Sequence, residues 1–153
     1  MKSCRVREAG FSLSEVALVL AIMGILTALA MPMFLTYYQG ARLRTAADEV
    51  AAFLNQGRQL GIKENVGVCA QITTTTMRYR IGGCGGTAWV GPGTDADGNI
   101  ALPQGVTLTT TADPVFSYLG AASPTATYTV TNTQTSATLR VFVSAAGRVS
   151  IGP

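Results

Sequence analysis

An apolar run near the N-terminus constrains this chain more than any other feature. The 25 residues from Phe11 to Leu35 contain one charged side chain, Glu15, and the next charge along the chain is that of Arg42. At a rise of about 1.5 Å per residue, a helix of this length crosses a bilayer core of about 30 Å. The sequence therefore predicts a membrane-inserting helix.

Three kinds of membrane segment fit the residues around this run. The preceding leader is basic and carries Lys2, Arg5 and Arg7 with a single acid, Glu8. A secretory signal peptide would be cleaved after Ala30, at the end of a small-residue triplet. A signal anchor would stay uncleaved, with the basic leader in the cytoplasm. The third alternative places the processing site between Gly10 and Phe11, where the charged leader meets the apolar run.

Glu15 favours the third alternative. A carboxylate inside a membrane segment is costly and marks a candidate functional site, whereas a signal peptide gains nothing from one. Gly10 followed by F-S-L-S-E resembles the class III signal of type IV prepilins and type II secretion pseudopilins. The matching features are the glycine, the phenylalanine after it, a glutamate at the fifth mature position and the long apolar run.

The resemblance implies a specific fate for the N-terminus. A prepilin peptidase would cut after Gly10 on the cytoplasmic side and methylate the new amine of Phe11, so that residues 1–10 are a cleaved leader and residues 11–35 the transmembrane helix. Gly24 and Pro32 match positions at which pilin helices loosen or kink. In the family's filaments Glu15 of one subunit would neutralise the amine of a neighbour.

Physical chemistry allows two roles for Glu15. An unpaired buried charge is penalised severely, so pairing with an amine would favour one axial register of packed helices. Alternatively, its position at the end of the apolar run lets the carboxylate reach the headgroup region.

Composition argues against catalysis and nucleic-acid binding. The chain has 153 residues, enough for one membrane helix and one modest domain. The leader supplies three of the eleven basic and one of the eight acidic side chains, which leaves the mature chain a net charge of about +1. No histidine is present, which removes the commonest general base and metal ligand. We therefore expect no enzymatic site, no cofactor and no metal.

The cysteines predict one disulfide. Cys4 would leave with the leader, and Cys69 and Cys84 remain in a domain that the topology places in the periplasm, where disulfides persist. A Cys69–Cys84 disulfide is favoured over two free thiols. Two thiolates without a histidine do not make a zinc site.

Helical periodicity continues beyond the membrane segment through residues 36–63. One face recurs at steps of four and three residues: Leu43, Ala47, Val50, Leu54, Gly57 and Gly61. The pattern predicts one helix from Phe11 to about Ile62, kinked at Pro32, with this stripe packed on a core.

Residues 64–153 predict a β domain. Runs 66–73 and 77–81 suggest a hairpin, with Cys69 and Cys84 facing each other across it, and residues 82–99 are mostly loop. Further strands are expected at 106–111, 115–119, 127–131, 137–143 and 148–151, with Ser144–Gly147 as the turn of the last hairpin. A long helix followed by short antiparallel strands is an α+β fold.

Two further segments indicate which group of prepilin-like proteins the chain resembles. A-A-F-L-N-Q-G-R-Q-L-G-I-K-E-N, which contains Arg58 and Ile62, and the closing V-F-V-S-A-A-G-R-V-S-I resemble the GspH/FimT group of minor pseudopilins and minor pilins. That resemblance implies a pilin-like helix packed on two small antiparallel sheets.

Two polar clusters have alternative interpretations. Asp95, Asp97 and Asn99 alternate like calcium ligands, but Gly98 is misplaced for that pattern, so an ordinary turn is favoured. Arg140 and Arg148 are expected near each other on the last hairpin and would give at most a weak, salt-sensitive DNA contact. Nucleic-acid binding is therefore not the expected function.

The sequence predicts a minor pseudopilin of a type II secretion pseudopilus, anchored once in the inner membrane with its C-terminal domain in the periplasm. Its expected partners are the prepilin peptidase, other pilin or pseudopilin subunits and the inner-membrane assembly platform. The alternative is a FimT-like minor type IV pilin for pilus biogenesis, adhesion or DNA uptake. A third alternative, from a different class, is a secreted binding domain released after Ala30.

Overall fold

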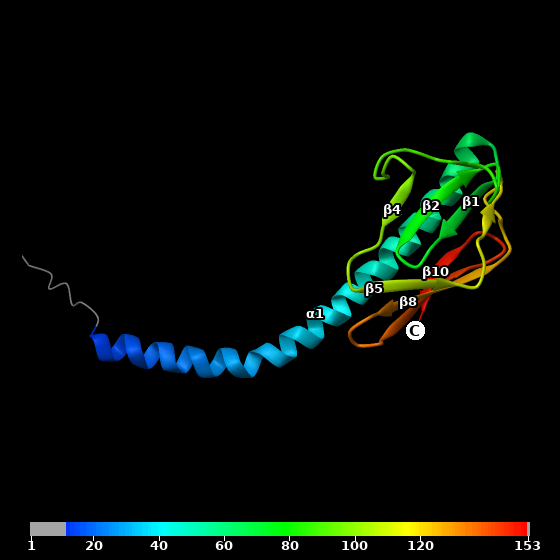
Figure 1. Cartoon of the computed structure of the whole chain (residues 1–153). Coiled ribbons are helices and arrows are strands. Elements are labelled where there is room, and N and C mark those ends of the chain that lie inside the picture. Colours follow the sequence, from blue (N-terminus) through cyan, green and yellow to red (C-terminus); the bar gives the residue numbers. More distant parts are fainter. Residues whose placement is uncertain (1–11, 153) are drawn as a thin grey trace, which may run out of the picture. The chain divides into compact units, whose positions relative to one another are not determined.

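The computed structural model describes residues 12–152 (Figure 1). The chain forms two compact units, one ending at Tyr38 and the other beginning at Gln39. Helix α1, Leu13–Glu64, contributes to both units. The predicted long helix is confirmed, and its end lies close to the expected Ile62.

The first unit consists of the N-terminal part of α1. Every large apolar side chain from Leu13 to Tyr38 is exposed within the chain. Among the described residues, α1 is the one helix long and apolar enough to cross a membrane, as judged by length and composition. Pro32 lies inside it, and the Thr36 hydroxyl donates to the Pro32 carbonyl at 3.1 Å. The kink at Gly24 and Pro32, and the predicted boundary between residues 35 and 36, stay predictions.

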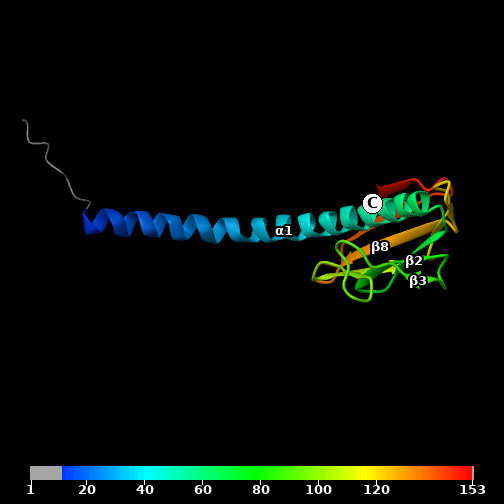
Figure 2. The same ribbon diagram turned by 90° about the horizontal axis from the view of Figure 1, so that it is seen from above.

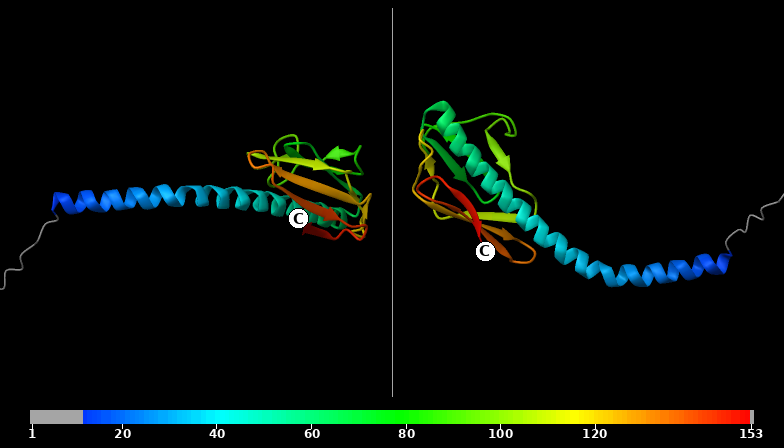
Figure 3. Two further views of the ribbon diagram at one scale, coloured as in Figure 1. Left: turned by 90° about the horizontal axis from the view of Figure 1, so that it is seen from below. Right: turned by 180° about the vertical axis from the view of Figure 1, so that it is seen from behind.

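The second unit contains two antiparallel sheets beside the C-terminal part of α1 (Figures 2 and 3). The first sheet has the order β3-β2-β1-β6-β7, with β4 also paired to β2; its strands are Val68–Ile72 (β1), Thr76–Ile81 (β2), Thr87–Ala88 (β3), Asn99–Ala101 (β4), Val115–Phe116 (β6) and Ala122–Ser123 (β7). The second sheet has the order β10-β9-β8-β5; its strands are Val106–Thr110 (β5), Ala126–Asn132 (β8), Thr138–Val143 (β9) and Val149–Gly152 (β10).

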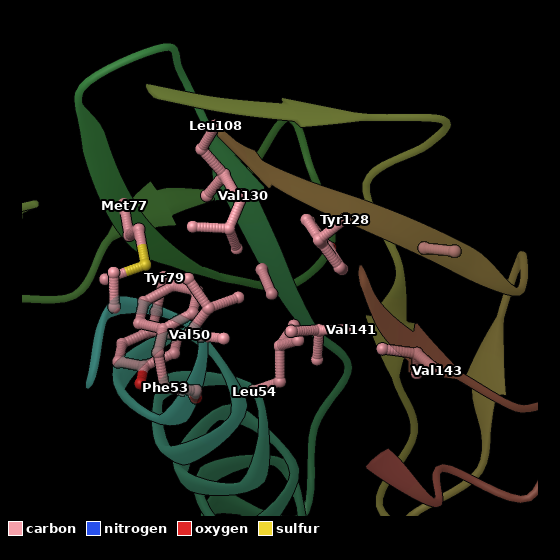
Figure 4. Close-up of a cluster of buried hydrophobic side chains, with 14 of the residues drawn as sticks. Val50, Phe53, Leu54, Met77, Tyr79, Leu108, Tyr128, Val130, Val141 and Val143 are labelled. Carbon is pink, nitrogen blue, oxygen red and sulfur yellow. Dashed lines mark hydrogen bonds between the residues drawn. The ribbon is translucent and has the colours of Figure 1, made fainter. Parts of the chain in front are cut away.

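The helix stripe predicted from Leu43 to Gly61 forms the core face of α1. All six predicted members are buried, together with three that the narrow stripe omitted: Ala46, Phe53 and Leu60. Phe53 stacks on Tyr79 with ring centroids 4.3 Å apart, and the Tyr79 hydroxyl donates to the Phe53 carbonyl at 2.7 Å (Figure 4). Every side chain of the buried core belongs to the second unit, so this unit holds its own hydrophobic core.

The longer predicted strands are confirmed. The β1–β2 hairpin, β5 and the β8–β9–β10 meander lie where alternation placed them. The expected strand 115–119 is wrong in length, because β6 ends at Phe116 and the chain turns back into β7. Strands β3, β4 and β7 were not predicted, since strands of two or three residues are too short to show a period.

The predicted disulfide is confirmed, but its expected geometry is wrong. Cys69 pairs with Arg80 across the β1–β2 ladder, not with Cys84. Cys84 lies beyond the end of β2, in a glycine-rich turn whose Gly82 and Gly83 have positive φ angles. The backbone N–H groups of both glycines donate to the Gly67 carbonyl, at 2.8 and 3.1 Å, so that the chain folds back and brings Cys84 over Cys69.

The β9–β10 turn is a contact point between the two sheets. Gly147 has a φ angle of +72° and its N–H donates to the Ser144 carbonyl at 2.8 Å. The N–H of Ala122, in β7, donates to the Ala145 carbonyl at 3.0 Å. A Cβ atom at Gly147 would overlap the carbonyl oxygen of Gly120, so this turn sits directly on the loop between β6 and β7.

Candidate functional site

The N-terminus of α1 is capped by its own side chains. The Ser12 N–H donates to Glu15 Oε2 at 3.1 Å, while the Ser12 hydroxyl accepts from the Ser14 N–H at 3.3 Å. The Ser12 carbonyl accepts the first helical hydrogen bonds, from Glu15 and Val16 at 3.0 and 3.2 Å. A serine at the cap with a glutamate three residues later is half of a capping box, in which the carboxylate satisfies a free donor.

This cap is a local role for Glu15 that was not predicted, although S-L-S-E is the sequence signature of such a cap. Gly10 and Phe11 lie outside the described residues. Cleavage after Gly10 would create an amine one residue before Ser12, and the carboxylate already turns back toward that end of the helix. A carboxylate in the first turn is also favoured by the helix dipole. The role of Glu15 in filament assembly stays a prediction.

The large apolar side chains that follow this cap are exposed in the described part of the chain. Leu13 is 88% exposed and Leu29 is 70% exposed. An ideal Cβ at Gly24 would meet no atom within 4 Å. Apolar side chains exposed in this number are stable only against lipid or against other helices.

The Asp95 loop is a turn, as predicted. Asp95 Oδ1 accepts from the N–H groups of Asp97 and Asn99 at 2.9 and 2.7 Å, and Oδ2 accepts from the Asn99 side-chain amide at 3.1 Å. The hydrogen bonds from Asn99 lower the pKa of Asp95 most. The carboxylate oxygens are used inside the loop, and residues 12–152 contain no cluster of three or more metal-ligating side chains.

The expected proximity of Arg140 and Arg148 is wrong. In the β9–β10 ladder Arg140 pairs with Gly152, and the pair Val149–Val143 lies next to Arg148 at the opposite end. Four residue positions along a strand correspond to about 13 Å. Both side chains are exposed, but the hairpin separates them instead of joining them. A DNA contact at these residues stays a prediction, but the two arginines would contact DNA separately and not as one site.

A pair of arginines on β2 was missed. Arg78 and Arg80 alternate with Met77 and Tyr79, which face the core, so both arginines lie on the outer face of the first sheet. Gln71 accepts from Nε of Arg78 at 2.8 Å and from Nε of Arg80 at 3.0 Å. The sequence signal for this pair is the alternation M-R-Y-R-I, in which the two arginines share one face of the strand.

A third arginine lies near the C-terminal end of α1. Nε of Arg58 is buried and has no hydrogen-bond partner among residues 12–152. It lies against Gly120 and Gly147, where an ideal Cβ would come within 2.8 and 3.2 Å of it. The two glycines therefore leave the space that the arginine side chain occupies.

Comparisons with known proteins agree with these features. Residues 5–31 match the family model described as the prokaryotic N-terminal methylation motif. No curated protein sequence matches the chain.

Two solved structures share the fold. The type IV minor pilin FimU of Pseudomonas aeruginosa PAO1 has 16% identity and a TM-score of 0.56, over 76% of this chain and 92% of FimU. The minor pseudopilin EpsH of the Vibrio cholerae type 2 secretion system has 11% identity and a TM-score of 0.57, over 72% of this chain and 96% of EpsH. The chain therefore combines a prepilin methylation motif with a pilin-like α+β fold: a long apolar helix packed on two small antiparallel sheets.

Proposed function

We propose that this chain, a pilin-like protein with a prepilin processing motif, is a minor pseudopilin: a structural subunit of a type II secretion pseudopilus, not an enzyme. The observation that carries the proposal is the exposed apolar helix that begins at the Ser12–Glu15 cap, within the matched methylation motif of residues 5–31. A globular domain with its own core attached to such a helix is what a filament subunit requires.

The proposed mechanism has two stages. Before assembly the apolar part of α1 anchors the subunit in the inner membrane, with the β domain in the periplasm. Prepilin peptidase then cuts after Gly10 and methylates Phe11, and the assembly platform transfers the subunit into a filament. There the lipid contacts of α1 are replaced by helices of neighbouring subunits.

Glu15 is the residue proposed to guide this packing. Its carboxylate caps the helix in the monomer through the Ser12 N–H. In the cap the donor to Glu15 is the neutral Ser12 N–H, whereas the amine created at Phe11 is a donor with a full positive charge. Because a charged hydrogen bond in a low-dielectric environment is stronger than a neutral one, Glu15 exchanges the cap for the amine of a neighbour.

The alternative function is that of a minor type IV pilin. FimU is named as such a pilin and resembles this chain as closely as EpsH does. Adhesion, pilus biogenesis and DNA uptake are the roles that this alternative would allow. The fold serves both machines, so the apparatus has to be identified by experiment.

The assembly proposal is tested by replacing Glu15 with glutamine, which keeps the shape of the side chain and removes its charge. The matched control is Glu49→Gln, on an exposed position of the same helix in the second unit. We expect both variants to be cleaved and methylated at Phe11, and only Glu15→Gln to be depleted from sheared filaments. Equal incorporation of the two variants would refute the charge-pairing mechanism.

Two further measurements identify the machine. A deletion strain that retains exoproteins in its periplasm, and exports them again on complementation, supports the pseudopilus; unchanged export with loss of pili supports the minor pilin. A mature N-terminus at Met31 instead of Phe11 would establish the secreted-domain alternative and exclude both filament functions.

A further inference from the structure

The outer face of the first sheet carries two positive charges held close together. Arg78 and Arg80 both use Nε to donate to one atom, Gln71 Oε1, at 2.8 and 3.0 Å. Since both contact the same oxygen, the two Nε atoms lie within about 6 Å of each other, a distance at which like charges repel. Nη1 of Arg80 also donates to the Gly86 carbonyl at 2.7 Å, which fixes the plane of this guanidinium.

Among residues 12–152 no carboxylate oxygen lies within 4.0 Å of a nitrogen of either guanidinium. Within residues 12–152 the one ion pair shorter than 4.0 Å joins Lys63 and Glu64, elsewhere in the domain. The partner shared by the arginines, Gln71, is a neutral amide. The position between the two guanidinium groups is therefore filled by an uncharged acceptor, which leaves their repulsion uncompensated.

The pair retains unused donors. Nε of each arginine and Nη1 of Arg80 are engaged, while the remaining Nη groups make no further hydrogen bond within the described part of the chain. Both side chains are half-buried, so their stems are held by the sheet. A guanidinium presents its N–H groups as a planar fork that matches oxyanions.

We propose that Arg78 and Arg80 form a binding site for a phosphate group in its dianionic form. The two guanidinium groups together carry a charge of +2. A single carboxylate would neutralise half of this charge, whereas a tetrahedral dianion would neutralise all of it. A bound phosphate would also replace the repulsion between the arginines by two attractions. The site does not depend on the proposed filament function, because all its residues lie on the β domain.

The surroundings favour a phosphate group over a nucleobase-binding surface. In the β2 ladders Arg78 pairs with Asn99 and Arg80 pairs with Ala88, so the residues beside the arginines are small or amidic. Tyr79 faces the core, and Trp89 packs edge-on against it, with ring centroids 5.6 Å apart. Single-stranded nucleic acids are bound by aromatic side chains on which bases stack, and the ladder partners of Arg78 and Arg80 provide none.

Gln71 is the positioning residue of this site. Its amide oxygen holds both guanidinium groups without neutralising either. Replacing it by glutamate would keep the geometry and add the missing carboxylate. The internal ion pairs formed in Gln71→Glu would then occupy the arginines and exclude phosphate.

The test uses the full chain in a neutral detergent and follows the Nε–Hε signals of its arginines by NMR during titration with inorganic phosphate at constant ionic strength. We expect the signals of Arg78 and Arg80 to shift together and to saturate with one dissociation constant. Each of Arg78→Gln and Arg80→Gln should weaken binding about tenfold or more, the loss of one charged contact. Arg44→Gln, at an exposed position of α1 in the same unit, is the matched control and should leave the dissociation constant unchanged.

Further experiments distinguish a lipid headgroup from free phosphate, and phosphate from acetate or DNA, as the ligand. Displacement of phosphate by vesicles that contain phosphatidic acid, but not by phosphatidylcholine vesicles, would identify a lipid headgroup; no displacement by either would identify free phosphate. Gln71→Glu should abolish the saturable shift while the remaining spectrum stays folded. Retained phosphate binding in Gln71→Glu would overturn the proposal. So would equal, unsaturated shifts with acetate, or a DNA duplex that binds the pair and is not displaced by phosphate.

Discussion

Gly147 is the position at which a single methyl group should most disturb the packing of the two sheets. Its φ angle of +72° lies in the left-handed region, and a Cβ there would overlap the carbonyl oxygen of Gly120. The overlapping atom belongs to the backbone, so no side-chain rotation relieves the contact. Gly147→Ala therefore combines backbone strain with a steric conflict between the last hairpin and the β6–β7 loop.

The cost of Gly147→Ala follows from these two effects. An alanine in the left-handed region costs about 1–2 kcal/mol. Overpacking against atoms that cannot move aside costs about 1–3 kcal/mol more. We expect a loss of about 3 kcal/mol, a large fraction of the stability of a domain that unfolds with about 5–15 kcal/mol.

Two further variants separate the contributions. Gly93 has a φ angle of +88° and an ideal Cβ there meets nothing within 4 Å, so Gly93→Ala carries the strain alone. Gly147→Asn lowers the strain, because asparagine tolerates the left-handed region, but keeps the overlapping Cβ. Urea unfolding of the domain beginning at Gln39 measures all three. If Gly147→Ala and Gly93→Ala lose the same free energy of unfolding, the packing argument is refuted.

Three more changes test the core of the domain. Reduction of the Cys69–Cys84 disulfide, which spans a separation of 15 residues, should lower the free energy of unfolding by about 3 kcal/mol in urea titrations, and an unchanged midpoint would contradict this. Tyr79→Phe removes the 2.7 Å hydrogen bond to the Phe53 carbonyl and should cost about 1 kcal/mol. The buried Tyr128 hydroxyl interacts with the Thr110 side chain, whose own hydroxyl already donates to the Ala112 carbonyl, so Tyr128→Phe should cost less; equal costs would count against this difference. Burial raises the pKa of both tyrosines above the ordinary value of 10.0, so the unfolded chain loses these protons first and stability should fall as the pH rises above 10, less steeply in the double phenylalanine variant.

Long periodic elements were predictable because their periodicity is repeated many times. The stripe from Leu43 to Gly61 repeats over five turns, and the alternation of Leu139, Val141 and Val143 repeats along a whole strand. Such repetition leaves one face apolar, and burial of that face decides the secondary structure. The short strands β3, β4 and β7 carry no such repeat, so they were not predictable.

The candidate sites also differ in whether they were predictable: those made of neighbouring residues were, and those that depend on strand register were not. The processing motif and Glu15 lie in one contiguous stretch of the sequence. An enzyme that recognises a linear segment requires no other part of the fold, so this site was predictable from the sequence. The Arg78–Gln71–Arg80 cluster requires knowledge of which residue of β1 faces which residue of β2, and that register was not predicted. The expectation for Arg140 and Arg148 failed for the same reason, because closeness in a hairpin depends on position in the ladder and not on membership of the hairpin.

The sequence by itself determined the apolar helix, the processing signal, the helix face that becomes buried and the order of the longer strands, because each depends on residues that are neighbours along the chain. Only the tertiary structure decided which distant groups meet: Cys84 over Cys69 through the glycine turn, Gly147 on Gly120, and two arginines on one glutamine oxygen. These contacts depend on strand register and on backbone angles that glycine alone adopts freely, and both are set by the packing of the whole domain.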